Sequence, residues 1–189
     1  MSNPGPTHWM AVKRVFRYLN GTQTLGLTYH KGGELEPLAY SDADWGSNPN
    51  DQKSISGYTF LMMGAPVSWQ SKKQPTIALS SLEAEYMAES LATWQVIWLC
   101  TIMSELGIPY YGPTTLNVDN QGTISFVINP INHARTKHIN IKHHFMQEKI
   151  VSNEMWIQYC AMDDNLVDLL IKGLLRLNHK DLVTQLRMV

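Results

Sequence analysis

The stretch Tyr40-Ser41-Asp42-Ala43-Asp44-Trp45 predicts a short strand that brings carboxylates to its end. Three further acidic residues stand at comparable positions, each after an expected strand or within an expected helix: Glu85, Asp119 and Asp168. Positions of this kind converge at one edge of an α/β sheet, where ligand sites of that fold class usually form. We therefore treat the carboxylates of Asp42, Glu85, Asp119 and Asp168 as candidates for one shared site.

The length and composition of the chain describe an ordinary globular protein. Its 189 residues suit one domain, or one domain with an appendage; 44% of them are hydrophobic and 16% are charged. The formal net charge of −1 gives no overall basic signature for nucleic acid, although an acidic metal site can mask local basic patches. Cys100 and Cys160 form no paired motif, no signal peptide opens the chain, and no apolar run is long enough to span a bilayer. We expect a soluble intracellular, cytoplasmic protein with no membrane partner.

Hydrophobic periodicity and turn residues predict a mixture of helices and strands. We expect helices over residues 6–19, 82–106, 122–128, 139–151, 164–170 and 180–188. We expect strands over residues 25–30, 37–44, 56–63, 67–71, 115–118 and 155–160, with short turns joining the second to the fourth as an antiparallel meander. This order favours a mixed α/β fold.

Two of the expected helices carry apolar stripes. Thr7 can cap the first helix, and we expect a neighbouring element to cover its stripe of Trp9, Val12, Val15, Phe16 and Leu19. In the long helix, four-residue spacing predicts a buried face formed by Trp94, Trp98, Ile102 and Leu106, with Met87 and Leu91 alongside.

A cluster of carboxylates has a specific chemical use. Hydrolysis of a phosphodiester by two metal ions needs several carboxylates around one space, and oxygen ligands of this kind suit Mg²⁺ or Mn²⁺. Each candidate also has a simpler interpretation. Ser80 and Glu83 have the spacing of a helix capping box, and Glu85, two residues further on, can instead be a solvated charge. Asp119 can form a turn, and Asp168 can be an ordinary charge within a helix.

Several stretches resemble the ribonuclease H domain of copia-type retrotransposon polyproteins, in the same order along the chain. They are residues 40–45, 53–58, 68–74, 80–88, 119–121, 136–145 and 164–170. The resemblance implies a ribonuclease H-like five-stranded mixed sheet, three antiparallel strands followed by two parallel ones, with helices on both faces. It also implies a site that holds two Mg²⁺ ions, for which Mn²⁺ can substitute, and that cuts the RNA strand of an RNA–DNA hybrid.

The same resemblance implies a role for each carboxylate. Asp42 matches the first Asp of the family, and Glu85 matches the second Glu of its Glu-Ala-Glu-Tyr motif. Asp119 matches the Asp that opens the Asp-x-Gln pattern, and Asp168 matches the last Asp of the closing helix. All four would hold the metal ions and so form the catalytic set.

The resemblance divides the chain into two parts. Residues 1–34 are similar to the connection segment from the reverse transcriptase side, and residues 35–189 are similar to the ribonuclease H domain. No Tyr-x-Asp-Asp polymerase signature occurs in the chain. The reverse transcriptase portion of the same polyprotein is therefore an expected partner, beside the RNA–DNA hybrid.

Small polar side chains and cations beside the carboxylates are candidates for hybrid binding. Ser80, Ser81, Asn120 and Gln121 would read 2′-hydroxyl groups in the minor groove, although Ser80 can equally serve as a cap. Phosphate contacts would come from Lys72 and Lys73, which can equally be solvated charges. The histidines at positions 138, 143 and 144 are too close together and too far from either Cys for a zinc site, so we expect partly exposed side chains on a helix.

Two other functions stay open at this point. The chain can be a decayed or repurposed remnant that keeps the fold and only binds nucleic acid or protein. It can also be another nuclease or an integrase of the same fold, although the Asp-x-Gln and Glu-Ala-Glu-Tyr motifs fit ribonuclease H better. The presence of all four carboxylates favours an enzyme.

Overall fold

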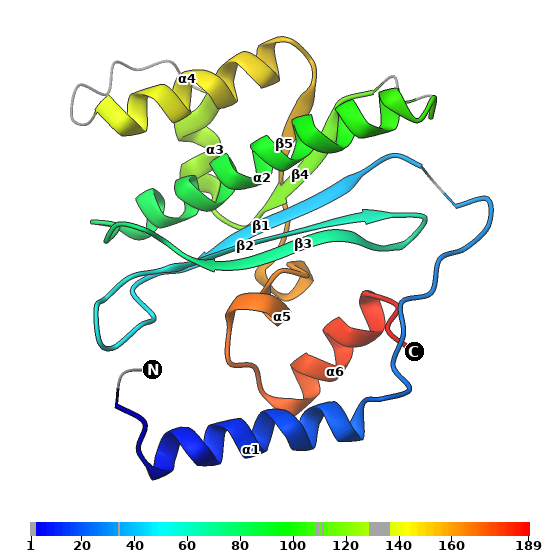
Figure 1. Ribbon diagram of the computed structural model, residues 1–189. Helices are drawn as coiled ribbons and strands as arrows, with labels where there is room; N and C mark the ends of the chain where they lie inside the picture. Colours follow the sequence, from blue (N-terminus) through cyan, green and yellow to red (C-terminus); the bar gives the residue numbers. More distant parts are fainter. Residues whose placement is uncertain (1–2, 34, 109, 111, 129–136) are drawn as a thin grey trace.

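A central five-stranded sheet organises the computed structural model, which describes residues 3–33, 35–108, 110, 112–128 and 137–189, without the side chains of 137–143 (Figure 1). The strands are β1 (Leu38–Asp44), β2 (Ile55–Met62), β3 (Ala65–Lys73), β4 (Thr114–Val118) and β5 (Met155–Tyr159). The helices are α1 (Pro6–Gly21), α2 (Ser81–Glu105), α3 (Gln121–Ile128), α4 (Lys137–Val151), α5 (Asp168–Ile171) and α6 (Arg176–Gln185), with the 3₁₀ turn η1 (Met162–Asp164) before α5. Within the described ranges, no helix is both long and apolar enough to cross a membrane.

The sheet has the strand order β3-β2-β1-β4-β5. Strands β1, β2 and β3 pair antiparallel, whereas β4 pairs parallel with β1 and β5 pairs parallel with β4. The predicted mixed sheet, three antiparallel strands followed by two parallel ones, is therefore confirmed. Because β1 and β4 run in the same direction, their carboxyl ends lie side by side and bring Asp42 and Asp119 to the same edge.

Helices cover both faces of the sheet, as predicted (Figure 1). On one face, a core made by the sheet and α2 includes Phe60, Val96 and Leu116, all fully buried. On the other face, Leu61 of β2 packs in a second core with Leu182 of α6. The two cores hold the sheet between layers of helices, so the end of β1 has a rigid support.

The long helix α2 buries a different face from the one predicted. Trp94, Trp98 and Leu106 are each more than half exposed, so this part of the expected buried face is wrong, whereas Met87, expected alongside, is buried. The face against the sheet is made mostly of small residues, among them Ala84, Ala88, Ala92 and Val96. Small side chains let the helix axis approach the sheet closely, whereas an indole at these positions would hold it away. A helix that is apolar on both sides gives no clear periodicity, which explains the error.

The first helix also differs from its prediction. Its N-cap is Gly5, whose backbone N–H donates to the imidazole Nδ1 of His8 at 2.8 Å, so Thr7 does not cap it. The expected cover over its apolar stripe is absent from the described residues, and no residue of α1 is buried. Residues 25–30 form no strand, because Leu27 makes only an isolated bridge to Met188 near the C-terminus.

The closing segment is interrupted where one continuous helix over 164–170 was expected. The carboxamide of Asn165 donates to the carbonyl of Ser41 at 3.2 Å and accepts from the N–H of Val167 at 3.3 Å. These bonds pull the backbone out of helical geometry and split the segment into η1 and α5, so Asp168 begins a helix instead of lying inside one. The last helix is α6, which lies closer to the N-terminus than the predicted 180–188.

Candidate active site

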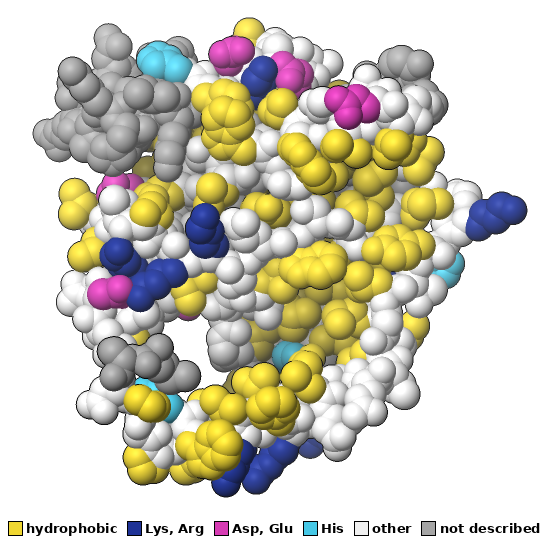
Figure 2. Space-filling view, in the orientation of Figure 1, with side chains coloured by type: hydrophobic (Ala, Val, Ile, Leu, Met, Phe, Trp, Pro, Cys, Tyr) yellow, Lys and Arg dark blue, Asp and Glu magenta, His cyan; other side chains and the backbone are white. Residues whose placement is uncertain are grey.

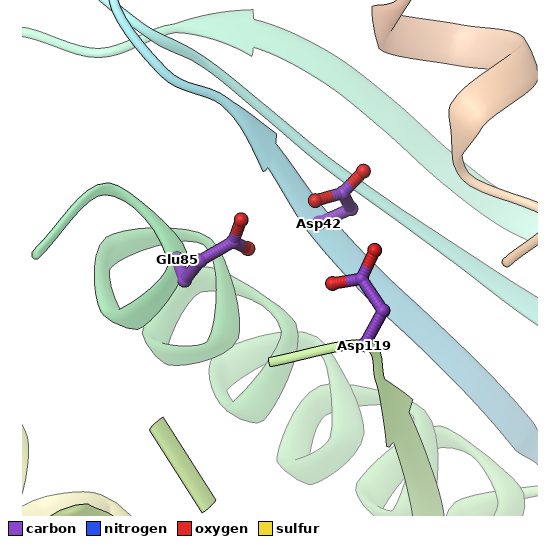
Figure 3. Close-up of side chains that lie close together, drawn as sticks. All are labelled: Asp42, Glu85 and Asp119. Carbon is purple, nitrogen blue, oxygen red and sulfur yellow. The ribbon is translucent and has the colours of Figure 1, made fainter. Parts of the chain in front are cut away.

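Three of the four predicted carboxylates meet at the edge of the sheet. Asp42 comes from β1, Glu85 from the first turns of α2, and Asp119 follows the end of β4 (Figure 3). One oxygen from each lies within 4.8 Å of the others. Three elements that are distant in sequence therefore direct negative charge into one small space.

The backbone of β1 ties two of these carboxylates together. The N–H of Ala43 donates both to Asp42 Oδ1 at 2.7 Å and to Glu85 Oε2 at 3.0 Å. Asp42 is almost fully buried, with 1% of its surface exposed, and Glu85 is partly buried. The fold thus holds both groups in fixed positions and removes much of their hydration.

Asp168 lies on the other side of Asp42 and is joined to it by a lysine. The ammonium Nζ of Lys172 contacts Asp42 Oδ2 and Asp168 Oδ1, each at 2.7 Å. Asp168 is not one of the three carboxylates that converge within 4.8 Å, so it belongs to a neighbouring part of the same site. Lys172 stands four residues after Asp168, the spacing that puts two side chains on one helical face.

A glycine of β2 makes room for the helix that carries Asp168. Gly57 pairs with Asp42 in the sheet, and a Cβ atom at this position would lie 2.6 Å from both Val167 Cγ1 and Ile171 Cγ2. Real Cβ contacts are essentially never so short. The absence of a side chain at Gly57 therefore allows α5 to approach the sheet close enough for Asp168 to reach the site.

The crowding of carboxylates changes their proton affinities. Burial, together with the charges of Asp42 and Asp119, raises the pKa of Glu85 to about 10. Burial and the charge of Asp42 also raise the pKa of Asp119. Burial and a hydrogen bond shared with Asp42 raise the pKa of Asp168 to about 7. Burial acts on Asp42 in the same direction, but hydrogen bonds with Asp168 and Lys172 outweigh it, so the pKa of Asp42 is lowered.

These residues fit a divalent cation. The converging groups are carboxylate oxygens, the ligands that Mg²⁺ and Mn²⁺ prefer, and they come from three rigid elements. A cation among them would remove the repulsion that raises the pKa of Glu85 and Asp119. The arrangement is therefore compatible with divalent metal binding.

The residues predicted to bind substrate fall into two groups. Ser81, Asn120 and Gln121 line a hollow of about 580 Å³ that also contains the three carboxylates. Ser80 lies outside the lining of that hollow, and its hydroxyl accepts from the N–H of Glu83 at 3.2 Å, as a helix cap does. The carboxylate of Glu83 accepts from the N–H of Leu79 at 2.8 Å, so Glu83 belongs to the same cap.

Asn120 and Lys73 have structural partners. The side-chain oxygen of Asn120 accepts from the N–H groups of Gly122 and Thr123, which fixes the start of α3. Lys72 and Lys73 end β3 and do not line the hollow, and Lys73 forms an ion pair of 2.6 Å with Asp51.

Of the three histidines, those at 138 and 143 have side chains outside the described part, and His144 is exposed.

Sequence reasoning missed two charged residues near the centre. Lys172 had a signal in its spacing from Asp168, but a lysine on a helix is usually a solvated charge. Glu89 stands one turn after Glu85 and is 1% exposed. Burial raises the pKa of Glu89 to about 8, against a lowering by the Thr123 hydroxyl. Nothing in the sequence distinguishes this buried glutamate from the exposed charges of an ordinary helix.

The fold and the site define a class of protein, and solved structures share that fold. The chain aligns with the crystal structure of LC11-RNase H1 in complex with RNA/DNA hybrid, with a TM-score of 0.51, 11% sequence identity, and cover of 72% of this chain and 94% of that one. At this identity the likeness concerns the fold, which is that of ribonuclease H. No protein-family model matches the chain.

Comparison of amino-acid sequences identifies relatives of most of this chain. The retrovirus-related Pol polyprotein from transposon RE2 of Arabidopsis thaliana is 39% identical over 176 residues, which are 93% of this chain and 12% of the relative. The secreted RxLR effector protein 161 of Plasmopara viticola is 54% identical over 98 residues, 52% of this chain and 69% of the relative. The relatives that match more than nine tenths of this chain are retrovirus-related Pol polyproteins of copia-like transposons, and the chain spans about an eighth of the length of the RE2 relative.

Proposed function

We propose that the chain is a metal-dependent endonuclease that hydrolyses the RNA strand of RNA–DNA hybrids during retrotransposon reverse transcription. The observation that carries this proposal is the convergence of Asp42, Glu85 and Asp119 within 4.8 Å at the edge of a ribonuclease H fold. The Pol polyprotein relatives and the RNA/DNA hybrid bound to LC11-RNase H1 support the choice of substrate.

Asp42, Glu85, Asp119 and Asp168 are the proposed metal-binding and catalytic residues. Two Mg²⁺ ions, when bound, would activate a water molecule and stabilise the leaving oxygen of the phosphodiester, with release of a 3′-hydroxyl and a 5′-phosphate. The Ala43 N–H holds Asp42 and Glu85 in place for this task. Lys172 keeps Asp42 and Asp168 together and supplies positive charge to that half of the site.

Substrate binding is proposed for the polar residues around the hollow. Ser81 and Gln121 are exposed and line it, so they are positioned to meet 2′-hydroxyl groups. Asn120 lines it as well, with its side-chain oxygen engaged by α3. Lys72 and Lys73 are proposed only as outer contacts to phosphates, and Ser80 as a support of α2.

The first test is a cleavage assay on an RNA–DNA hybrid labelled on its RNA strand, with Mg²⁺ or Mn²⁺. We expect metal-dependent cutting of the RNA strand that disappears with EDTA and in the variant Asp119→Asn. Cutting that survives Asp119→Asn would exclude the proposed site. Folded protein that never cuts, even at low salt and high concentration, would contradict the proposal for the isolated chain.

One observation favours a second function, a binding module without catalysis. A secreted effector protein shares 54% identity over 98 residues with this chain, so a related sequence occurs in a protein of a different name and context. In that case the chain would bind hybrid or protein with the same affinity in the wild type and in Asp119→Asn, and neither would cut. The cleavage assay therefore separates the two functions.

Within the polyprotein, we propose that residues 1–34 are a connection segment and residues 35–189 the ribonuclease H domain. The reverse transcriptase portion of the same polyprotein is the proposed protein partner. The relatives that cover 93% of this chain are Pol polyproteins about eight times longer than the matched stretch.

A further inference from the structure

Gln74 is a buried polar residue that directly follows β3, in the link of residues 74–80 that leads to α2. On the face of the molecule drawn in Figure 2, charged side chains lie scattered at the surface, whereas Gln74 is only 3% exposed. Burial of a carboxamide is unfavourable unless the group forms hydrogen bonds. The bonds that Gln74 forms therefore indicate its role.

The carboxamide of Gln74 joins the first turns of α2 to strand β2. Its nitrogen Nε2 donates to the carbonyl oxygen of Ala84 at 2.9 Å and to the hydroxyl Oγ of Ser56 at 2.8 Å. A carbonyl oxygen only accepts, so the bond to Ala84 fixes which end of the carboxamide is the nitrogen. The carboxamide oxygen Oε1 is buried and has no hydrogen-bond partner in the described part of the chain, so Gln74 adds little net stability.

The backbone of the link is fixed as well as the side chain. The N–H of Gln74 donates to the carbonyl of Ser54 at 2.8 Å, just before β2 begins. Further along the link, the carbonyl of Ala78 accepts from the indole Nε1 of Trp45 at 3.2 Å, just after β1 ends. The link is therefore held at two points, and Gln74 can fix α2 because its own position is fixed.

Both partners of the carboxamide are adjacent to residues of the candidate site. Ala84 directly precedes Glu85 in α2, and Ser56 pairs with Ala43 across β2 and β1. The N–H of Ala43 donates to Glu85 Oε2 at 3.0 Å. The bridge through Gln74 therefore runs beside the bond between Ala43 and Glu85 and holds the residues next to it.

Small side chains form the contact between β1 and the start of α2. Ala43 packs in one buried cluster with Ala84 and Ala88 of α2 and with Ala78 of the link. Apolar contact is non-directional, so these methyl groups bring the helix close without fixing its position along the strand. Hydrogen bonds have preferred distances and angles, so the bridge through Gln74 supplies the position that the alanines do not.

We infer that Gln74 is a positioning residue for Glu85: it holds the first turns of α2 against β2 and so sets where the Glu85 carboxylate meets that of Asp42 (Figure 3). The inference rests on the proposed function only for the metal ions that these carboxylates would bind. Gln74 does not line the hollow that contains them, so it acts through Glu85. Residues that orient metal ligands in this way typically account for about 10- to 100-fold in metal affinity.

Gln74→Met tests the inference, because methionine keeps the length of the side chain and removes the donor. In metal-free protein, the Ala43 amide proton should move upfield in the NMR spectrum, because its bond to the Glu85 carboxylate loosens. The dissociation constant for Mn²⁺, measured by calorimetry, should rise about tenfold. Ser56→Ala removes one of the two bonds and a single oxygen atom, so it should change both quantities in the same direction but less. This milder variant keeps the test valid if Gln74→Met does not fold.

Gln147→Met is the matched control. The carboxamide of Gln147 also donates to a helix carbonyl, that of Val127 at 3.0 Å, but it joins α4 to α3 and lies outside the lining of the hollow. We expect the Ala43 resonance and the Mn²⁺ affinity to stay at wild-type values in this variant. An unchanged Ala43 resonance in folded Gln74→Met would overturn the inference, and so would an equal loss of Mn²⁺ affinity in Gln147→Met. Wild-type protein that binds no Mn²⁺ would instead contradict the proposed function, and the Ala43 resonance would still decide the role of Gln74.

Discussion

The two sides of Asp42 have opposite electrostatics. On one side, Glu85 and Asp119 face Asp42 with no ion pair in the described part of the chain, and the pKa of each is raised. On the other side, Lys172 lies between Asp42 and Asp168 with an ammonium group 2.7 Å from each. The first side lacks a cation, and the second side contains one that the chain itself supplies.

This difference indicates how an acidic site persists in a folded protein. Buried carboxylates repel one another unless a cation or a proton neutralises them. On the Lys172 side the ammonium lowers that cost in every condition in which lysine is charged. On the Glu85 side only a bound proton or a metal ion can do so, and we expect this side to govern the response to metal.

The largest effect should come from a substitution on the Glu85 side of Asp42, which we call the cation-poor side. Glu85→Gln keeps the size of the side chain but removes a charge that would hold metal, so we expect hydrolysis to fall by about a thousandfold, equivalent to about 4 kcal/mol of transition-state stabilisation. Glu83→Gln is the matched control, because the Glu83 carboxylate caps the start of α2 and is not one of the converging carboxylates. The rate of hybrid cleavage measures both variants, and similar losses would refute the assignment of Glu85.

The raised pKa values of the buried carboxyl groups on both sides of Asp42 should make the metal-free protein less stable as the pH rises. A carboxyl whose pKa is higher in the folded protein than in the unfolded chain binds its proton more tightly when folded, so it favours folding at low pH and loses that contribution as the pH rises. Asp168, Glu89 and Glu85 have pKa values of about 7, 8 and 10. Each such group lowers the unfolding free energy by up to about 1.4 kcal/mol per pH unit between its unfolded and folded pKa, so we expect a fall of several kcal/mol between pH 4.5 and 8.

Added Mg²⁺ should reverse this trend, because a bound cation favours the charged carboxylates. Thermal unfolding in EDTA and in Mg²⁺ across that pH range measures both effects. The lowered pKa of Asp42 acts in the opposite direction, but only near and below its ordinary value of 3.8, outside this window. Metal that stabilised the protein equally at pH 5 and pH 8 would contradict the role given to the cation-poor side.

The sequence predicted the sheet well because its information is local and redundant. The short turns between β1, β2 and β3 predicted their antiparallel pairing, whereas the parallel pairing of β4 and β5 was an expectation from the family resemblance. Which side chains of α2 are buried, and whether those of α1 are covered, depends on the elements that pack against these helices. Trp94 stacks on Phe145 of α4 at 4.3 Å between ring centroids, a contact that no pattern within α2 can reveal.

The candidate site likewise contains some residues that the sequence indicated and others that it did not. Asp42, Glu85 and Asp119 became candidates from their positions at the ends and starts of elements, and the family resemblance, not the spacing, selected them over ordinary caps and surface charges. Lys172 and Gly57 were missed because their importance arises only when α5 packs against β2. A lysine or a glycine has many ordinary uses, and only the packed structure distinguishes them.

A substitution at Gly57 should disrupt the close packing of α5 against β2. A methyl group in Gly57→Ala would press on Val167 and Ile171, so α5 must shift and Asp168 must move away from Asp42. We expect a loss of about 2 kcal/mol in unfolding free energy and a marked loss of cleavage. Urea unfolding and the hybrid assay measure these effects. Gly173→Ala, where a Cβ meets nothing within 4 Å, should change neither, and a tolerated Gly57→Ala would mean that α5 is not held so closely.

The smallest effect should come from removing the internal cation. In Lys172→Met the hydrophobic stem is kept, and Asp42 and Asp168 can retain one proton between them, so we expect the metal-free protein to lose only about 1 kcal/mol near pH 6. Mg²⁺ should restore more stability to this variant than to the wild type, because the cation then serves both sides of Asp42.

Lys149→Met also breaks a partly buried ion pair, to Glu154 at 3.0 Å, but it touches none of the four carboxylates of the site. Its loss should not respond to Mg²⁺. If thermal unfolding shows that Mg²⁺ rescues both variants equally, the metal acts on the protein in general, and the two sides of Asp42 do not differ as described.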